Sequence, residues 1–267
     1  MKGEQQSGKT RGLVSAIIPA FNEAKTIRDV IAVVERHPLI DEVIVVDDGS
    51  TDGTCEEAKG TSAQVICFPQ NQGKASAMSA GVEAARNQLI FFLDADLHGL
   101  TPEIIDAIVR PVMTGQYGMF VAIRDRKAYW LNRILRFTPI LGGERVLTKD
   151  LWYQVPPAFK KNFQIEIALN FYTKTSGRKM GFAVMPGLTQ VIKEKKRGLL
   201  LGLYQRILMI LDVCWAAARI YLLHDPGEEP LLEACAREKS AGLGARISLS
   251  SKLSRSVRAP RAKHVRK

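Results

Sequence analysis

Several patterns that mark familiar nucleotide-binding and redox proteins are missing from this sequence. No GxGxxG follows the first apolar run and no GxxxxGK(S/T) occurs, which argues against a dinucleotide-binding Rossmann domain and against a P-loop. The segment after that run, PAFNEA, is not glycine-rich, as a nucleotidyltransferase would need. The cysteines form no CxxC pair and no metal-type spacing, so we expect reduced thiols in a cytosolic protein: Cys55, Cys67, Cys214 and Cys235.

Long uncharged apolar runs are also scarce. The N-terminus has none, and Pro19 interrupts its only short one, so no signal peptide is expected. The longest run, Gly198 to Leu223, contains Arg206, Asp212 and Arg219. Each charge near the centre of a membrane helix costs about 2.5–3.5 kcal/mol, whereas each of the twelve Leu, Ile and Val residues returns about 0.3–0.6 kcal/mol. A spanning helix is therefore disfavoured, and we predict a helix that docks on the protein or lies at a membrane interface.

Positive charge is concentrated at the C-terminal end. The net charge is +11, but residues 237–267 contain ten Lys and Arg against one acidic residue, Glu238, which leaves the first 236 residues at about +2. The tail has few large apolar groups, so we expect it to be disordered. It could contact an anionic membrane surface. It lacks the interleaved aromatic residues that stack on bases, so nucleic acid is a weaker alternative.

Short apolar runs alternate with amphipathic or small-residue segments over the first 113 residues. The predicted strands are Leu13 to Ile18, Val43 to Val46, Val65 to Phe68 and Leu89 to Leu93. Helices are predicted after each of them, beginning near Ile27, Cys55, Ala75 and Ile104. A regular strand–helix alternation predicts a parallel, doubly wound α/β sheet.

Two carboxylates follow the fourth predicted strand. Asp94 and Asp96 are two residues apart, so in an extended segment both side chains point to the same side. Two hard oxygen donors at the carboxyl edge of such a sheet are suited to Mg²⁺ or Mn²⁺ bound with a phosphate. The alternative is a solvated turn that ends the strand.

Four strand ends therefore carry polar motifs: IIPAFNEA, VVDDGSTDGT, NQGKASAMSAG and FFLDADLHGLTPE. Their order and spacing resemble a family 2 glycosyltransferase of the GT-A fold, and in particular the dolichol- and polyprenyl-phosphate sugar synthases. The resemblance covers roughly Val14 to Lys196. It implies a Rossmann-like, mostly parallel sheet with helices on both faces.

The resemblance also implies a nucleotide-sugar donor and a divalent cation at the sheet edge. Asp94 and Asp96 would bind the metal, Asp94 would also contact the ribose, and Asp96 would be catalytic through the cation. The expected donor-binding residues are Pro19, Asn22, Glu23, Asp48, Gly73, Lys74, Asp94 and Lys196. Each has a plainer alternative as a turn residue, a helix cap or a solvated side chain.

His98 departs from the DADLQ that such synthases often carry. An imidazole at this position is expected to be a third metal ligand that favours Mn²⁺, or else a solvent-exposed histidine at a helix entry. Lys196 belongs to a late basic loop, 193–197, where the family often contacts the diphosphate.

The acceptor side is expected after Met119 to Ile123, a further predicted strand. The predicted acceptor-binding residues are Arg124, Arg126, Gly143, Glu144 and Arg145. Glu166, on a predicted helix, is the first candidate for a general base if the acceptor is a hydroxyl, with Glu144 second. A phosphate acceptor is already an anion and needs no base, in which case arginines would bind it. Glu166 could instead be the buried partner of one of those arginines.

These observations lead to one predicted function and two alternatives. We expect transfer of a hexose from a UDP- or GDP-sugar to an acceptor such as polyprenyl phosphate, with Mg²⁺ or Mn²⁺. The alternatives are a soluble enzyme of the glucosyl-phosphoglycerate type and a non-catalytic nucleotide-sugar-binding protein tethered by its tail. The predicted layout is a flexible segment 1–12, a GT-A domain 13–197, a hydrophobic helix 198–224 and a basic tail 225–267, located in the cytoplasm and peripherally on the inner face of the plasma membrane.

Overall fold

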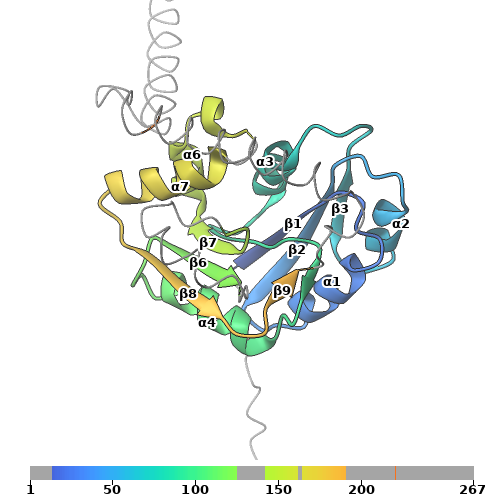
Figure 1. Cartoon of the computed structure of the whole chain (residues 1–267), viewed down its shortest axis with the longest axis horizontal. Coiled ribbons are helices and arrows are strands. Elements are labelled where there is room, and N and C mark those ends of the chain that lie inside the picture. Colours follow the sequence, from blue (N-terminus) through green and yellow to red (C-terminus); the bar gives the residue numbers. More distant parts are fainter. Residues whose placement is uncertain (1–13, 125–141, 162–163, 191–219, 221–267) are drawn as a thin grey trace, which may run out of the picture. The chain divides into compact units, whose positions relative to one another are not determined.

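The structure is a computed structural model of the 267-residue chain, and it describes residues 14–124, 142–161, 164–190 and 220 (Figure 1). Within them, the main sheet has seven strands in the order β3-β2-β1-β4-β7-β6-β8. Their bounds are β1 Val14–Ala20, β2 Ile40–Asp47, β3 Gln64–Cys67, β4 Leu89–Phe92, β6 Met119–Arg124, β7 Arg145–Thr148 and β8 Met180–Met185. A separate two-stranded sheet pairs β5 (Leu97–His98) with β9 (Thr189–Gln190).

The half of the main sheet that carries the sequence motifs is parallel. Strands β3, β2, β1 and β4 all run in the same direction, whereas β7 is antiparallel to both β4 and β6, and β8 is parallel to β6. The apolar runs 43–46 and 90–92 are buried without alternation, as expected for strands covered on both faces. The predicted mostly parallel sheet is confirmed.

Helices cover both faces of this sheet (Figure 1). One hydrophobic cluster packs α1 (Ile27–Glu35), α2 (Thr54–Lys59) and α4 (Pro102–Met113) against it, and a second packs α3 (Lys74–Ala84), α6 (Lys149–Gln154) and α7 (Gln164–Thr175). A short 3₁₀ helix, Pro157–Phe159, joins α6 to the segment before α7. The predicted α/β fold with helices on both faces of the sheet is therefore confirmed.

The first strand was predicted to end at Ile18, before Pro19, and that end is wrong. β1 continues to Ala20, and Pro19 pairs in register with Val46. The Ala20 carbonyl accepts from Asp48 on the β2 side, whereas the Ile17 carbonyl accepts from Leu93 on the β4 side. Since alternate residues of a strand face opposite neighbours, the missing N–H of proline points to the β4 side, beyond the end of β4 at Phe92, and no ladder bond is lost.

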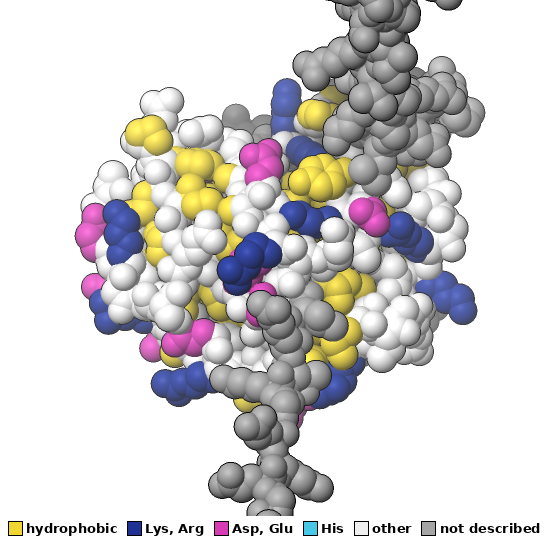
Figure 2. Space-filling view, turned by 180° about the vertical axis from the view of Figure 1, so that it is seen from behind, with side chains coloured by type: hydrophobic (Ala, Val, Ile, Leu, Met, Phe, Trp, Pro, Cys, Tyr) yellow, Lys and Arg dark blue, Asp and Glu magenta, His cyan; other side chains and the backbone are white. Residues whose placement is uncertain are grey.

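The described residues cover most of the predicted domain 13–197 and little else. Segments 1–12 and 225–267 lie outside them, as does 198–224 apart from Ile220, which is fully buried in the second cluster. No helix in the described part of the chain is long and apolar enough to cross a bilayer. On the face seen in Figure 2, Lys and Arg are interspersed with Asp and Glu, as expected for a body that is nearly neutral.

Candidate active site at the carboxyl edge of the sheet

The polar motifs come together because the strands that precede them are parallel. β1, β2, β3 and β4 end at one edge, and the loops 21–26, 48–53, 68–73 and 93–101 follow them there. Ligands of open α/β sheets bind at this edge. The structure therefore brings together the motifs that the sequence placed far apart.

Three consecutive backbone amides of the first loop are each bound by a side chain of the second. Asn22 N–H donates to Ser50 Oγ (2.8 Å), Glu23 N–H to Thr54 Oγ1 (2.8 Å) and Ala24 N–H to Asp52 Oδ2 (3.1 Å). In return, Asn22 Oδ1 accepts from the Thr51 amide at 3.0 Å, and Asn22 has a positive φ of 56° that asparagine tolerates. We call residues 22–24 and 50–54 the loop latch.

Asp52 is the charged member of the loop latch. Its second oxygen accepts from the Thr54 amide at 3.1 Å and from the Thr54 hydroxyl. Burial alone would raise the pKa of Asp52, but the hydrogen bonds from Thr54 and from Ala24 outweigh it and lower that pKa. Asp52 therefore fixes two loops in its ionised form, a role that the sequence alone did not separate from a plain turn.

Asp48 fixes the third loop. Its buried carboxylate accepts from the Gln72 amide at 2.7 Å and the Gly73 amide at 2.9 Å, so both oxygens bind the backbone at the start of α3. Gly49, with φ of 73°, packs so closely that a Cβ there would lie 2.4 Å from the carbonyl carbon of Gln70. The loops after β2 and β3 therefore touch through backbone, and the predicted role of Asp48 in donor binding stays a prediction.

A disulfide joins the same two loops. Cys55, in the first turn of α2, is bonded to Cys67, the last residue of β3. The expectation of reduced thiols is therefore wrong for these two cysteines. Sequence spacing could not find the pair, because it forms only when the parallel pairing of β2 with β3 places the end of β3 next to α2.

The turn after β4 contains both carboxylates predicted to bind the metal, Asp94 and Asp96. Its middle carbonyl, of Ala95, accepts from the hydroxyl of Thr26 at 2.9 Å, which ties the turn to the start of α1. Asp96 is buried, at 3% exposure, and the Asp94 side chain is 15% exposed. Thr26 was not singled out from the sequence, since a threonine before a helix is an ordinary cap candidate.

Six charged side chains form a group beside this turn, which we call the charged cluster: Lys74, Asp94, Arg124, Glu144, Arg145 and Glu166. Lys74 Nζ lies 2.5 Å from Asp94 Oδ1, and Arg124 Nη2 contacts Asp94 Oδ2. Arg124 Nε also donates to both oxygens of Glu144, at 3.0 and 3.1 Å. Three positive and three negative side chains make the charged cluster formally neutral.

Charge pairing shifts the protonation of this group. Burial alone would raise the pKa of Asp94, but Lys74 and Arg124 lower it to about 2. Burial and the nearby Asp94 raise the pKa of Glu144, against the effect of Arg124. Burial opposes the positive charge of Lys74, but the carboxylates of Asp94 and Glu166 raise its pKa. Asp94 is therefore an anion at any ordinary pH.

Arg145 and Glu166 form the deeper part of the charged cluster. The Arg145 side chain is 1% exposed, and its Nε and Nη2 donate to the Gly142 carbonyl at 3.0 and 2.6 Å. Glu166 Oε2 lies 3.8 Å from Arg145 Nη2, and its side chain is 14% exposed. Burial lowers the pKa of Arg145, which Glu166 partly offsets. This arrangement agrees with the alternative in which Glu166 is the partner of a buried arginine.

The neighbouring predicted residues are divided between the site and other places. Gly143 packs on Asp94, where an added Cβ would lie 2.6 Å from Oδ2. His98 is exposed on β5, and within the described ranges no set of three potential ligands includes it; the set that is close together is Asp47, Cys55 and Cys67. Arg126 and Lys196 lie outside the described residues.

The residues present fit a divalent cation. Carboxylate oxygens are the ligands that Mg²⁺ and Mn²⁺ prefer. Both oxygens of Asp94 already contact cationic side chains, so Asp94 binds a cation directly only if one of these contacts is exchanged, and Asp96 is buried beside it in the same turn.

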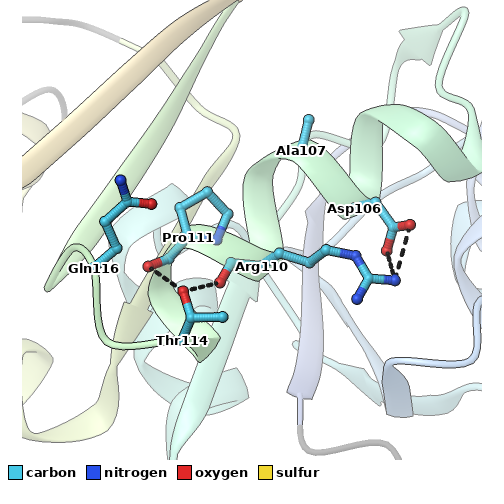
Figure 3. Close-up of a pocket in the computed structure, with 6 residues that line it drawn as sticks. All are labelled: Asp106, Ala107, Arg110, Pro111, Thr114 and Gln116. Atoms are coloured by element: carbon cyan, nitrogen blue, oxygen red, sulfur yellow. Dashed lines mark hydrogen bonds and ion pairs between the residues drawn. The ribbon is translucent and has the colours of Figure 1, made fainter.

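A surface pocket of about 360 Å³ lies elsewhere (Figure 3). It is lined by α4 and the turn after it, through Asp106, Ala107, Arg110, Pro111, Thr114 and Gln116. Arg110 pairs with Asp106 one helical turn away, and none of the predicted site residues lines this pocket. It is therefore a feature of the α4 surface and separate from the strand-end site.

Comparison with known proteins agrees with the kind of site that the geometry indicates. The model of the family "Glycosyl transferase family 2" matches residues 15–175. Glucosyl-3-phosphoglycerate synthase of Mycobacterium tuberculosis is 30% identical over 153 residues, which are 54% of this chain and 47% of that protein. Undecaprenyl-phosphate 4-deoxy-4-formamido-L-arabinose transferase of Aeromonas hydrophila is 32% identical over 131 residues, 45% of this chain and 40% of that protein.

A solved structure is similar over a longer stretch. The Mycobacterium tuberculosis glucosyl-3-phosphoglycerate synthase in complex with Mn²⁺ and UDP-glucose superposes with a TM-score of 0.60 at 26% identity, covering 77% of this chain and 79% of that one. This chain spans about half the length of the curated relatives that it matches.

Proposed function

Because this chain belongs to glycosyl transferase family 2, we propose that it transfers a hexose from a UDP- or GDP-sugar to a phosphorylated acceptor in the presence of Mn²⁺ or Mg²⁺. The observation that carries the proposal is the arrangement of side chains at the carboxyl edge of the sheet. There, Asp94 and Asp96 follow β4, with Lys74 and Arg124 in contact with Asp94 and with the loop latch beside them. UDP-glucose and Mn²⁺ are the ligands of the similar solved structure.

The donor would occupy the loops after β1, β2 and β3. The loop latch and Asp48 fix the backbone of these loops, which favours a preformed nucleoside pocket at Pro19, Asn22 and Glu23. Gly73, with φ of 93° and nothing within 4 Å of an added Cβ, leaves space for the ribose or the diphosphate near Lys74. Lys196 remains a proposed contact outside the described residues.

Asp96, with Asp94 beside it, is the proposed ligand for the divalent cation. Such a cation supplies stabilisation of the charge that grows on the departing diphosphate. Lys74 contacts the carboxylate of Asp94, which favours the positively charged form of the lysine. Lys74 would therefore stabilise the charge on the departing diphosphate without any proton transfer.

The acceptor would approach from the side of β6 and β7. Glu144 has no solvent exposure and is bound by Arg124, so Glu166 is the better proposed base for a hydroxyl acceptor. Arg124 would bind an acceptor anion once it leaves Asp94 or Glu144. The names of the two relatives share one chemistry, a phosphorylated acceptor, from a small phosphoglycerate in one and a polyprenyl lipid in the other.

A donor screen tests this function. Each of UDP-glucose, UDP-galactose, GDP-mannose and GDP-glucose is incubated with Mn²⁺ or Mg²⁺ and either 3-phosphoglycerate or a short polyprenyl phosphate, and release of nucleoside diphosphate is measured. Asp96→Ala should lower the rate at least about 100-fold. Asp29→Ala, at an exposed carboxylate on α1, is the control and should leave it unchanged. Full activity of Asp96→Ala would contradict the proposed metal site.

We also propose that the protein works in the cytoplasm, peripherally on the inner face of the plasma membrane. The support is the excess of basic residues in 237–267, since each such residue near an anionic surface contributes about 1 kcal/mol of attraction. The full chain should float with vesicles that contain anionic lipid and not with neutral ones. Failure to float with either would favour the soluble phosphoglycerate acceptor.

A further inference from the structure

The disulfide lies where the loops of the proposed donor pocket begin. Cys55 and Cys67 are 12 residues apart in the sequence, and the bond connects the start of α2 with the end of β3. Both residues are half-buried. The carboxylate of Asp47, the last residue of β2, lies within 4.8 Å of both sulfur atoms. The ends of β2 and β3 and the start of α2 therefore meet at this bond, beside the loops of the proposed donor pocket.

The Cys55 end is directly attached to the loop latch. The residue before it, Thr54, accepts the Glu23 amide and donates to Asp52, which in turn binds the Ala24 amide. Any displacement of the start of α2 would therefore move the groups that fix residues 22–24.

The Cys67 end is attached to the third loop. Cys67 pairs in register with Asp47, and the next amide, of Phe68, donates to the Asp47 carbonyl at 2.8 Å. Residues 70–73 follow at once, and the amides of Gln72 and Gly73 bind the carboxylate of Asp48. Movement of this end would therefore loosen the backbone at the start of α3.

We propose that the Cys55–Cys67 bond is a redox-responsive site that sets the affinity of the chain for a nucleoside diphosphate. A dithiol reductant attacks one sulfur, the protein disulfide becomes two thiols, and the reductant is oxidised to its own disulfide, so two electrons and two protons pass to the protein. That the ligand is a nucleotide rests on the proposed function, whereas the coupling of the disulfide to the loops does not.

Reduction removes the covalent cross-link between the start of α2 and the end of β3 and leaves hydrogen bonds to fix the two loops. Loops held by a few partly exposed hydrogen bonds open locally at small cost, and each opening takes the pocket out of its binding shape. The apparent dissociation constant rises as the fraction of the binding-competent state falls. The reduced chain should therefore bind a nucleotide more weakly, with the sheet unchanged.

Hydrogen exchange of the nucleotide-free chain tests the coupling by itself. The full-length variant Cys214→Ser/Cys235→Ser is used, so that Cys55 and Cys67 are its two cysteines. Reduction by dithiothreitol should speed exchange of the amides at 22–24 and 72–73 about tenfold or more, and amides of β6 should keep their rates. Equal rates at 22–24 and 72–73 in both states, with reduction verified by mass, would overturn the proposal. Absence of the bond in air-oxidised protein would also overturn it.

Titration of UDP and GDP in the presence of Mn²⁺ tests the consequence. The dissociation constant of the nucleotide that binds should rise about tenfold on reduction, equivalent to about 1.4 kcal/mol, and return on reoxidation. A further variant that also carries Cys55→Ser/Cys67→Ser should bind as the reduced chain does and ignore dithiothreitol. A dissociation constant unchanged by reduction overturns the proposal. If neither nucleotide binds in either state while exchange still responds to reduction, the coupling of the bond to the loops stands and the proposed function is what fails.

Discussion

The loop latch and the charged cluster lie at the same sheet edge but are built in different ways. The loop latch uses neutral amides, hydroxyls and one exposed carboxylate to bind backbone to side chain. The charged cluster pairs side chain with side chain, and its Arg124–Glu144 pair is almost completely buried. The loop latch fixes the shape of a loop through hydrogen bonds in which Asp52 is the one charged side chain. The charged cluster keeps full charges close together, and an incoming anion or cation can replace one partner of a charged pair.

This difference has a consequence for substrate binding. A nucleoside is largely neutral and needs a pocket of fixed shape, which the loop latch favours. A diphosphate, a metal ion and an acceptor phosphate are charged, and each can replace one partner in the charged cluster while total charge stays paired. Substitutions in the two regions should therefore differ in what they change as well as in how much.

The largest effect is expected from Arg124→Met. It leaves Glu144 buried without its charged partner and removes one of the two cations on Asp94. Removal of one member of a buried pair destabilises a protein by about 3–5 kcal/mol. The free energy of unfolding, measured by urea denaturation at pH 7, should fall by about this amount, and transfer activity should be lost.

The double variant Arg124→Met/Glu144→Met is the control, since it leaves no unpaired charge at Glu144 and should recover part of the loss.

Low pH gives a second check through Asp94, whose pKa is about 2 in the folded chain against 3.8 as reference. Because this pKa is depressed, its contribution to stability is complete above pH about 4 and disappears as pH falls toward about 2. Glu144, with a raised pKa, has the opposite sign, so the slope lost in Asp94→Asn isolates the Asp94 part. A denaturation loss below about 1 kcal/mol for Arg124→Met would show that the pair behaves as an exposed one.

Gly143→Ala should have an intermediate effect. The added Cβ would lie 2.6 Å from Asp94 Oδ2, so the carboxylate that contacts Arg124 must shift. A displacement of about 1 Å at a reacting site can lower a rate about 100-fold. Steady-state kinetics should show this loss in kcat, with a folded chain. In an Asp94→Asn background the same change should add little, and additive losses would place its cause elsewhere.

Most of the parallel half of the fold could be predicted from the sequence. The apolar runs at 43–46 and 89–93 are short and bounded by turn residues, and the apolar spacing of Ile27, Val30, Ile31 and Val34 indicated α1 correctly, since all four are buried. The antiparallel β7 and the small sheet of β5 and β9 were not predicted. The two-residue strands β5 and β9 carry too little pattern, and the pairing of β7 is fixed only by tertiary contacts.

The composition of the site was predictable and its connections were not. Motif order placed Asp94, Asp96, Lys74 and Asp48 at one edge because parallel strands end together. Arg124 lies on β6, 20 or more residues along the chain from Glu144 and Asp94. The sequence therefore does not show which carboxylate pairs with it. The disulfide and the loop latch are likewise contacts between loops. The two-residue spacing of Ser50, Asp52 and Thr54 was a visible signal, since it favours one side of an extended loop.

The smallest effect is expected from Asp52→Asn, which tests the loop latch without touching the charged cluster. Asparagine keeps one oxygen acceptor but turns an NH₂ toward a donor, either the Ala24 amide or Thr54. The loss of one such hydrogen bond contributes about 0.5–1.5 kcal/mol, so the KM for the donor should rise about two- to tenfold while kcat changes little. Asp29→Asn, exposed on α1, is the matched control and should leave both constants unchanged. A fall in kcat at constant KM would mean that the loop latch acts on the reacting groups, and the separation between the two regions would then be lost.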